Sequence, residues 1–100
     1  MKFDYIDIVK QIVLKHIPKD NFAVFLFGSR AVGNAKPLSD IDIGVLGPEP
    51  LPTLIKEDLE ESIFPYKIDL IDFYKVDKDF KKEALNTIQI WKCPKNISLN

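Results

Sequence analysis

The stretch FGSRAVGNAKPLSDIDIGV, residues 27–45, decides the fold of this chain. It overlaps the end of an apolar run over residues 22–27, which predicts a buried strand. Gly28 and Ser29 follow that run at once, and glycine, asparagine and proline then interrupt the chain before residue 40. Residues 40–45 alternate acidic and apolar side chains before Gly44, which predicts a second strand. The stretch is therefore interpreted as strand, tight turn, exposed loop and strand.

The second strand carries a pair of acids, Asp40 and Asp42. Side chains alternate in a strand, so both carboxylates are expected on one face, about 7 Å apart. At an effective dielectric of about 20 they repel by roughly 2 kcal/mol, and aspartate is a poor strand former. A divalent cation removes this repulsion, and Mg²⁺ prefers oxygen ligands and completes its shell with water and substrate phosphates. The pair therefore predicts a magnesium site.

Gly28 and Ser29 predict a phosphate site next to these acids. Glycine allows a ligand close to the backbone, and amides that start a short helix, with the Ser29 hydroxyl, bind anions. Arg30 and Lys36 are the cations of the loop, each a phosphate ligand or a plain surface charge, with Arg30 favoured because it follows Ser29. A Gly-Ser pair or an Asp-x-Asp pair alone is typical of turns, but packing does not explain the combination. It implies a nucleoside triphosphate with its metal.

A third acid is expected on a strand over residues 66–71. Alternation places Asp69 on one face of this strand and Ile68 and Leu70 on the other. A carboxylate in so apolar a strand needs a partner, which is either a lysine or the metal site, if this strand lies beside the second one. Asp72 is the competitor, and it ranks lower because it lies at the strand end on the opposite face.

Gly28-Ser29, ten residues and then Asp40-Ile41-Asp42 resemble the signature of the DNA polymerase beta-type nucleotidyltransferases. The short chain and the later KIDLID segment, residues 67–72, resemble the minimal nucleotidyltransferases, the MNT proteins. The resemblance extends to about residue 91. It implies a two-layer nucleotidyltransferase core in which the first two acids bind metal and a third acid, matching Asp69, completes the site. It also implies a small helical HEPN protein as partner.

The expected reaction moves a nucleoside monophosphate, AMP from ATP, to an acceptor hydroxyl. Asp40 and Asp42 would hold the Mg²⁺ of the triphosphate, and together with Asp69 they would hold a second Mg²⁺ that activates the acceptor. Gly28, Ser29 and Arg30 would bind the phosphates. An acceptor-binding domain is not expected in so short a chain, so either the acceptor site is borrowed from another chain or the acceptor is itself a protein. The resemblance implies that this protein is a HEPN toxin. Two alternatives stay open: a small-molecule acceptor shared with a partner chain, and an antitoxin that binds without catalysis.

Composition sets broader limits. The chain has 100 residues, a net charge of −1 and a single cysteine, so it has no overall field for nucleic acid and no internal disulfide. No apolar run is long enough to span a membrane, and the N-terminus lacks the pattern of a signal peptide. These features predict a cytoplasmic protein, and they leave a homo-oligomer open.

The fold expected from these patterns is α/β, with a small mixed sheet and helices mainly on one face. Apolar residues at helical spacing predict helices over 3–17, 51–63 and 77–86, the last one capped by Asp77. Residues 87–91 are interpreted as an edge strand, with Ile88, Ile90 and Trp91 as a possible partner contact. A single domain is expected over residues 1–92, followed by a frayed tail over 93–100.

Overall fold

The computed structural model describes residues 5–17, 20–28, 31, 33, 40–63 and 67–99. The elements along the chain are α1 (Tyr5–His16), β1 (Ala23–Phe27), β2 (Ile41–Leu46), α2 (Thr53–Ser62), β3 (Ile68–Asp72), α3 (Lys78–Ala84) and β4 (Gln89–Lys92). The predicted order of helices and strands is therefore confirmed, with ends that differ by a few residues. None of the helices in the described ranges has the length and apolar character needed to cross a membrane.

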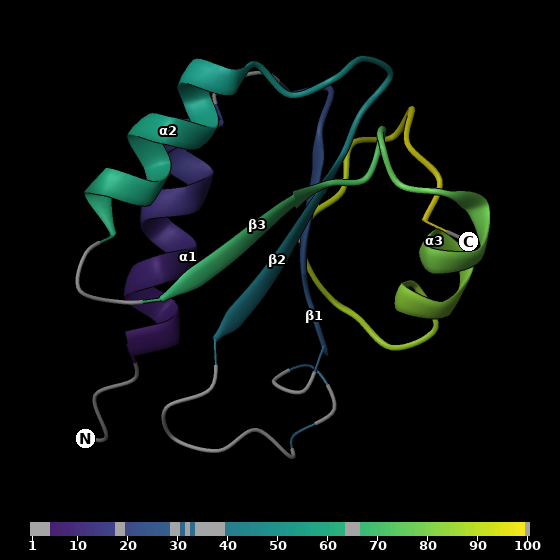
Figure 1. Ribbon diagram of the computed structural model, residues 1–100, viewed down its shortest axis with the longest axis horizontal. Helices are drawn as coiled ribbons and strands as arrows, with labels where there is room; N and C mark the ends of the chain where they lie inside the picture. Colours follow the sequence, from purple (N-terminus) through teal and green to yellow (C-terminus); the bar gives the residue numbers. More distant parts are fainter. Residues whose placement is uncertain are drawn as a thin grey trace.

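The four strands form one mixed sheet in the order β3-β2-β1-β4 (Figure 1). β1 pairs antiparallel with β2, and β4 lies antiparallel on the other side of β1. β3 pairs with β2 in the parallel direction. A parallel neighbour needs a crossover between the strands, and α2 supplies it. The prediction of a small mixed sheet is confirmed.

One face of the sheet is covered by α1 and α2 (Figure 1). Alternate residues of β1 and β2, among them Leu26 and Ile43, point to this face and are buried. Val9 and Val13 of α1 and Leu59 of α2 pack on them and are fully buried. These helices repeat their apolar residues every three or four positions, and the matched apolar faces hold this layer together.

The other face of the sheet carries aromatic residues and is covered by α3 and the C-terminal segment (Figure 1). The ring of Phe73, just after β3, lies edge-on to Phe25 and Phe27 of β1, with centroids 4.9 and 5.3 Å apart. Gly44 of β2 makes room for these rings, because a Cβ on it would lie 2.3 Å from Phe25 Cε2. The predicted helix cap is confirmed on this side, where Asp77 Oδ1 accepts a hydrogen bond of 2.7 Å from the backbone N–H of Phe80.

The C-terminal segment differs from the frayed tail expected over residues 93–100. Leu99 is only 9% exposed, and it packs with Ile97 against the aromatic face of the sheet. The Ile97 N–H donates a 3.1 Å hydrogen bond to Pro94 O, which turns the chain back. The expectation failed because two apolar residues, spaced two apart among polar ones, are enough to anchor an extended segment. The single domain over residues 1–92 stays a prediction.

Candidate active site

Two of the predicted acids lie side by side at one end of the sheet. Asp42 of β2 is the register partner of Asp69 of β3, and neighbouring strands lie about 4.8 Å apart. Asp42 also pairs in register with Phe27, the last residue of β1. Alternation places both carboxylates on the aromatic face of the sheet, because Leu46 of β2 and Phe73 after β3 pack there. The parallel pairing of β2 and β3 therefore creates the acid pair.

Gly28 lies directly against the carboxylate of Asp42. An ideal Cβ placed on Gly28 would come within 2.3 Å of Asp42 Oδ2, and the backbone of Gly28 has a φ of 76°. Both the space and the backbone conformation require glycine here. The carbonyl oxygen of Gly28 accepts a hydrogen bond of 3.1 Å from the N–H of Ala31, so the chain leaves the sheet through a tight turn. Gly28 and Asp42, from the two halves of the sequence pattern, are thus neighbours in space, although thirteen residues lie between them in the chain.

Asp40 precedes β2 and is exposed to solvent. The ladder between β2 and β3 begins at the next residue, where the Ile41 N–H donates a 3.0 Å hydrogen bond to Lys67 O. Asp40 therefore lies just before this ladder, two residues before Asp42. Ser29, Arg30 and Lys36, with the loop that was expected to contain a short helix, lie outside the described residues.

Asp72 has a structural position that separates it from Asp69. Its Oδ2 accepts a 3.0 Å hydrogen bond from the Leu51 N–H, and its Oδ1 accepts one of 3.1 Å from the Tyr74 N–H. Oδ2 thus fastens the end of β3 to the segment that leads into α2, and Oδ1 holds the turn that follows β3. Asp69 is exposed on the opposite face, beside Asp42. The geometry favours Asp69 over Asp72 as the third acid, as the alternation in the sequence indicated.

The donor set can be tested for Mg²⁺ on its chemistry. Asp42 and Asp69 offer hard oxygen ligands from adjacent strands, and Mg²⁺ commonly takes one or two carboxylates and fills its shell with phosphate and water. Within the described part of the chain, no group of three or more His, Cys, Asp or Glu side chains is gathered closely enough to hold an ion. The acid pair therefore fits a magnesium ion that arrives with a phosphate ligand. The three-acid set with Asp40 stays a prediction.

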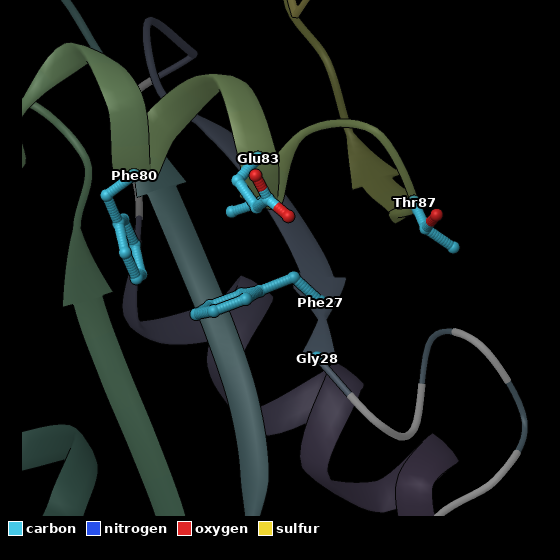
Figure 2. Close-up of a pocket in the computed structure, with 6 residues that line it drawn as sticks. Phe27, Gly28, Phe80, Glu83 and Thr87 are labelled. Atoms are coloured by element: carbon cyan, nitrogen blue, oxygen red, sulfur yellow. The ribbon is translucent and has the colours of Figure 1, made fainter.

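A pocket of about 350 Å³ opens beside Gly28, on the side away from β3 (Figure 2). Its wall is formed by the end of β1 and by α3 with the residues after it: Phe27, Gly28, Phe80, Glu83, Ala84 and Thr87. The sequence analysis did not identify Glu83 or Thr87. Their spacing from Phe80, three and seven residues, was a signal for a shared helical face, but which face meets β1 depends on the packing of α3.

The fold and the site define a class of protein. A carboxylate pair on a mixed sheet, next to a glycine turn and an adjoining pocket, is what a nucleotidyltransferase needs to hold a metal-bound triphosphate. Residues 6–91 match the nucleotidyltransferase domain family. The chain therefore belongs to this family, and the prediction of a nucleotidyltransferase is confirmed.

Two curated relatives match different lengths of the chain. "Probable protein adenylyltransferase MntA" of Haemophilus influenzae is 36% identical over 86 residues, which cover 82% of this chain and 74% of that protein. Spectinomycin 9-adenylyltransferase of Enterococcus faecalis is also 36% identical, over 63 residues that cover 63% of this chain and 25% of that enzyme. The first relative matches most of both chains, whereas the second contains much more than the shared region.

Solved structures share the fold. A toxin–antitoxin complex with AMP-PNP has a chain that aligns with a TM-score of 0.69 at 21% identity, over 86% of this chain and 74% of that one. The MNT antitoxin complex with the tri-AMPylated HEPN toxin of Shewanella oneidensis aligns with a TM-score of 0.60 at 20% identity, over 85% and 70%. At these identities the likeness concerns the fold. It confirms the nucleotidyltransferase-like core predicted from the sequence.

Proposed function

We propose that this protein transfers AMP from ATP to a hydroxyl group of a HEPN-type partner protein, and that it acts in this way as a cytoplasmic antitoxin. The observation that carries the proposal is the placement of Asp42 between Gly28 and Asp69. Similarity to a probable protein adenylyltransferase of matching length supports an AMP donor and a protein acceptor. The tri-AMPylated toxin in one of the structural relatives supports a HEPN protein as the acceptor.

In the reaction, the acceptor oxygen attacks the α-phosphorus of ATP, and the bond from that phosphorus to the oxygen of the leaving pyrophosphate breaks. Asp40 and Asp42 bind the metal-bound triphosphate, and Asp69 takes the proton from the acceptor hydroxyl. These acids would hold Mg²⁺, which would supply positive charge to stabilise the attacking and leaving oxygens. Gly28 leaves room for the phosphates close to the backbone, and Ser29 and Arg30 hold them in line with the acceptor.

The test compares the intact mass of a co-expressed HEPN partner after expression with the wild-type protein and with the Asp42→Asn variant. We expect added mass in whole AMP units with the wild type and none with Asp42→Asn, while both proteins stay folded. Asp58→Asn, an exposed change on α2, is the matched control and should transfer AMP like the wild type. A partner that gains no mass, although it co-purifies with the wild type, would contradict the proposal and favour an antitoxin that acts by binding alone.

A small-molecule acceptor is the second candidate, and the similarity to spectinomycin 9-adenylyltransferase favours it. The similar region covers only 25% of that enzyme, so the acceptor would have to bind where this chain meets a partner chain. Incubation of the complex with radiolabelled ATP and aminocyclitol antibiotics would reveal a labelled small product in that case. A label found only on the partner protein would contradict it.

A further inference from the structure

The pocket beside Gly28 continues directly from the candidate active site. Gly28 lines this pocket, and it also lies against the carboxylate of Asp42, whose Oδ2 occupies the space that a side chain on Gly28 would need. In the proposed function the α-phosphate reacts at the acid pair, and this phosphate carries the nucleoside, so Gly28 places the pocket directly beside the point where the nucleoside begins. The volume, about 350 Å³, lies within the range of small-molecule sites. Because Gly28 belongs to both the pocket and the acid site, and because the inference rests on the proposed function, we assign the pocket to another part of the nucleoside triphosphate.

Two aromatic rings form its apolar walls. Phe27 and Phe80 meet edge to face with centroids 6.4 Å apart, at an angle of 88°. Phe27 is buried, whereas Phe80 is 44% exposed. An exposed aromatic face beside an opening offers a stacking surface for a flat ring, and every nucleobase has such a ring. The walls therefore fit a nucleobase better than they fit a sugar or phosphate.

Glu83 gives the pocket a chemical preference. Figure 2 shows its carboxylate extending from α3 above the ring of Phe27. Among the residues that the structure describes, no side chain or backbone group forms an ion pair or hydrogen bond with this carboxylate. An ionised carboxylate only accepts hydrogen bonds, so it attracts an amino group and repels a carbonyl oxygen. Thr87, whose hydroxyl both donates and accepts, can serve a neighbouring ring nitrogen.

We propose that this pocket receives the base of the nucleoside triphosphate and that Glu83 selects bases that carry an exocyclic amino group in place of a carbonyl. The Glu83 carboxylate accepts a hydrogen bond from the amino group, and the ring of Phe80 stacks on the base. Replacement of that amino group by a carbonyl places two acceptors opposite each other. Adenine is accepted by this rule and hypoxanthine is rejected, just as cytosine is accepted and uracil is rejected.

The experiment measures the binding of ATP and ITP, with Mg²⁺, to the full chain by isothermal titration calorimetry. The two nucleotides differ at the group that Glu83 would contact. We expect ATP to bind roughly ten- to one-hundred-fold more tightly than ITP, the usual range for a base-specific contact. In Glu83→Gln the amide both donates and accepts, so the two affinities should approach each other within about threefold. Glu57→Gln, an exposed change on α2, should keep the preference of the wild type.

Equal binding of ATP and ITP to the wild type would overturn the assignment, and so would an unchanged ratio in Glu83→Gln. Because binding is measured without an acceptor, these results do not depend on AMP transfer. Asp42→Asn separates the two proposals further, since it should lose transfer and still prefer ATP to ITP. A wild type that transfers AMP without a preference for the amino group would contradict only the role of Glu83, whereas a preference without transfer would contradict only the proposed reaction.

Discussion

The Oδ2 atom of Asp42 fills the space that a side chain on Gly28 would need, because a Cβ at that position would lie only 2.3 Å from it. The glycine of the Gly-Ser turn is therefore part of the acid site as well as of the turn. Its backbone φ of 76° adds a second reason for glycine. These two requirements can be separated experimentally, because Gly33 shares one of them and lacks the other.

Gly28→Ala should abolish most of the AMP transfer activity. The new methyl group pushes the Asp42 carboxylate from its position, and a displacement of about 1 Å at a reacting centre can cost roughly a hundredfold in rate. Gly33→Ala is the matched control, because Gly33 has a φ of 80° and, among the residues that the structure describes, no atom lies within 4 Å of an added Cβ. Both variants carry a backbone strain of about 1–2 kcal/mol. Transfer rates and thermal unfolding of both variants test this, and equal activities would contradict the steric role of Gly28.

Asp69→Asn and Asp72→Asn should have different effects on catalysis. Asp69 lies beside Asp42 in register, so its loss should lower the transfer rate by roughly a hundredfold or more. Asp72 binds backbone amides on the other face, so Asp72→Asn should keep most of the activity at a temperature where it is folded. Initial rates at saturating ATP and Mg²⁺ measure the difference. A greater loss in Asp72→Asn than in Asp69→Asn would reverse the assignment of the third acid.

Asp72→Ala should instead reduce stability. The change leaves the amides of Leu51 and Tyr74 without their acceptors, and Leu51 is buried. Loss of such bonds costs about 1–3 kcal/mol in the free energy of unfolding. Urea denaturation followed by circular dichroism measures it, with Asp58→Ala on the exposed side of α2 as the control, expected within about 0.5 kcal/mol of the wild type. A stability for Asp72→Ala equal to that control would show that these hydrogen bonds contribute nothing.

Gly44→Ala should destabilise the fold through the aromatic layer. The added methyl would lie 2.3 Å from Phe25 Cε2 and 2.7 Å from Phe73 Cε1, and overpacking of this kind costs about 1–3 kcal/mol. Because the strain arises against Phe25, the double variant Gly44→Ala with Phe25→Leu should be more stable than the sum of the single effects predicts. Strictly additive free energies of unfolding would mean that the two side chains do not meet.

Alternation along single strands was enough to predict which acids share a face of the sheet, whereas contacts between distant elements could not be predicted in this way. The period of two in residues 66–71 assigned Asp69 and Asp72 to opposite faces, and the structure places them there. The order of the strands in the sheet, with β4 beside β1, could not be predicted from the sequence, because the pairing of strands depends on packing between segments far apart in the chain. The partner contact expected from Ile88, Ile90 and Trp91 does not form one exposed surface. Ile90 is 54% exposed, whereas Trp91 packs toward α1 and α2.

The second layer of the core was the main feature that the sequence did not predict. Helices on one face were expected from periodic apolar residues, and α1 and α2 follow that pattern. The aromatic face is covered by the seven residues of α3 and by an extended segment that ends in Leu99. Both are too short for periodicity to reveal which residues point inward. For the same reason Glu83 and Thr87 became candidates only after the pocket was located.

The position of Phe27 has a consequence for how this protein can change over evolution. Its ring belongs to the aromatic layer that holds α3 on the sheet, through Phe73 and Phe80, and the same ring is a wall of the pocket. A substitution that retunes the pocket at this position therefore also loosens the packing of α3. New substrate preferences are more accessible through Glu83 or Thr87, which line the pocket, are exposed and lie outside the buried core.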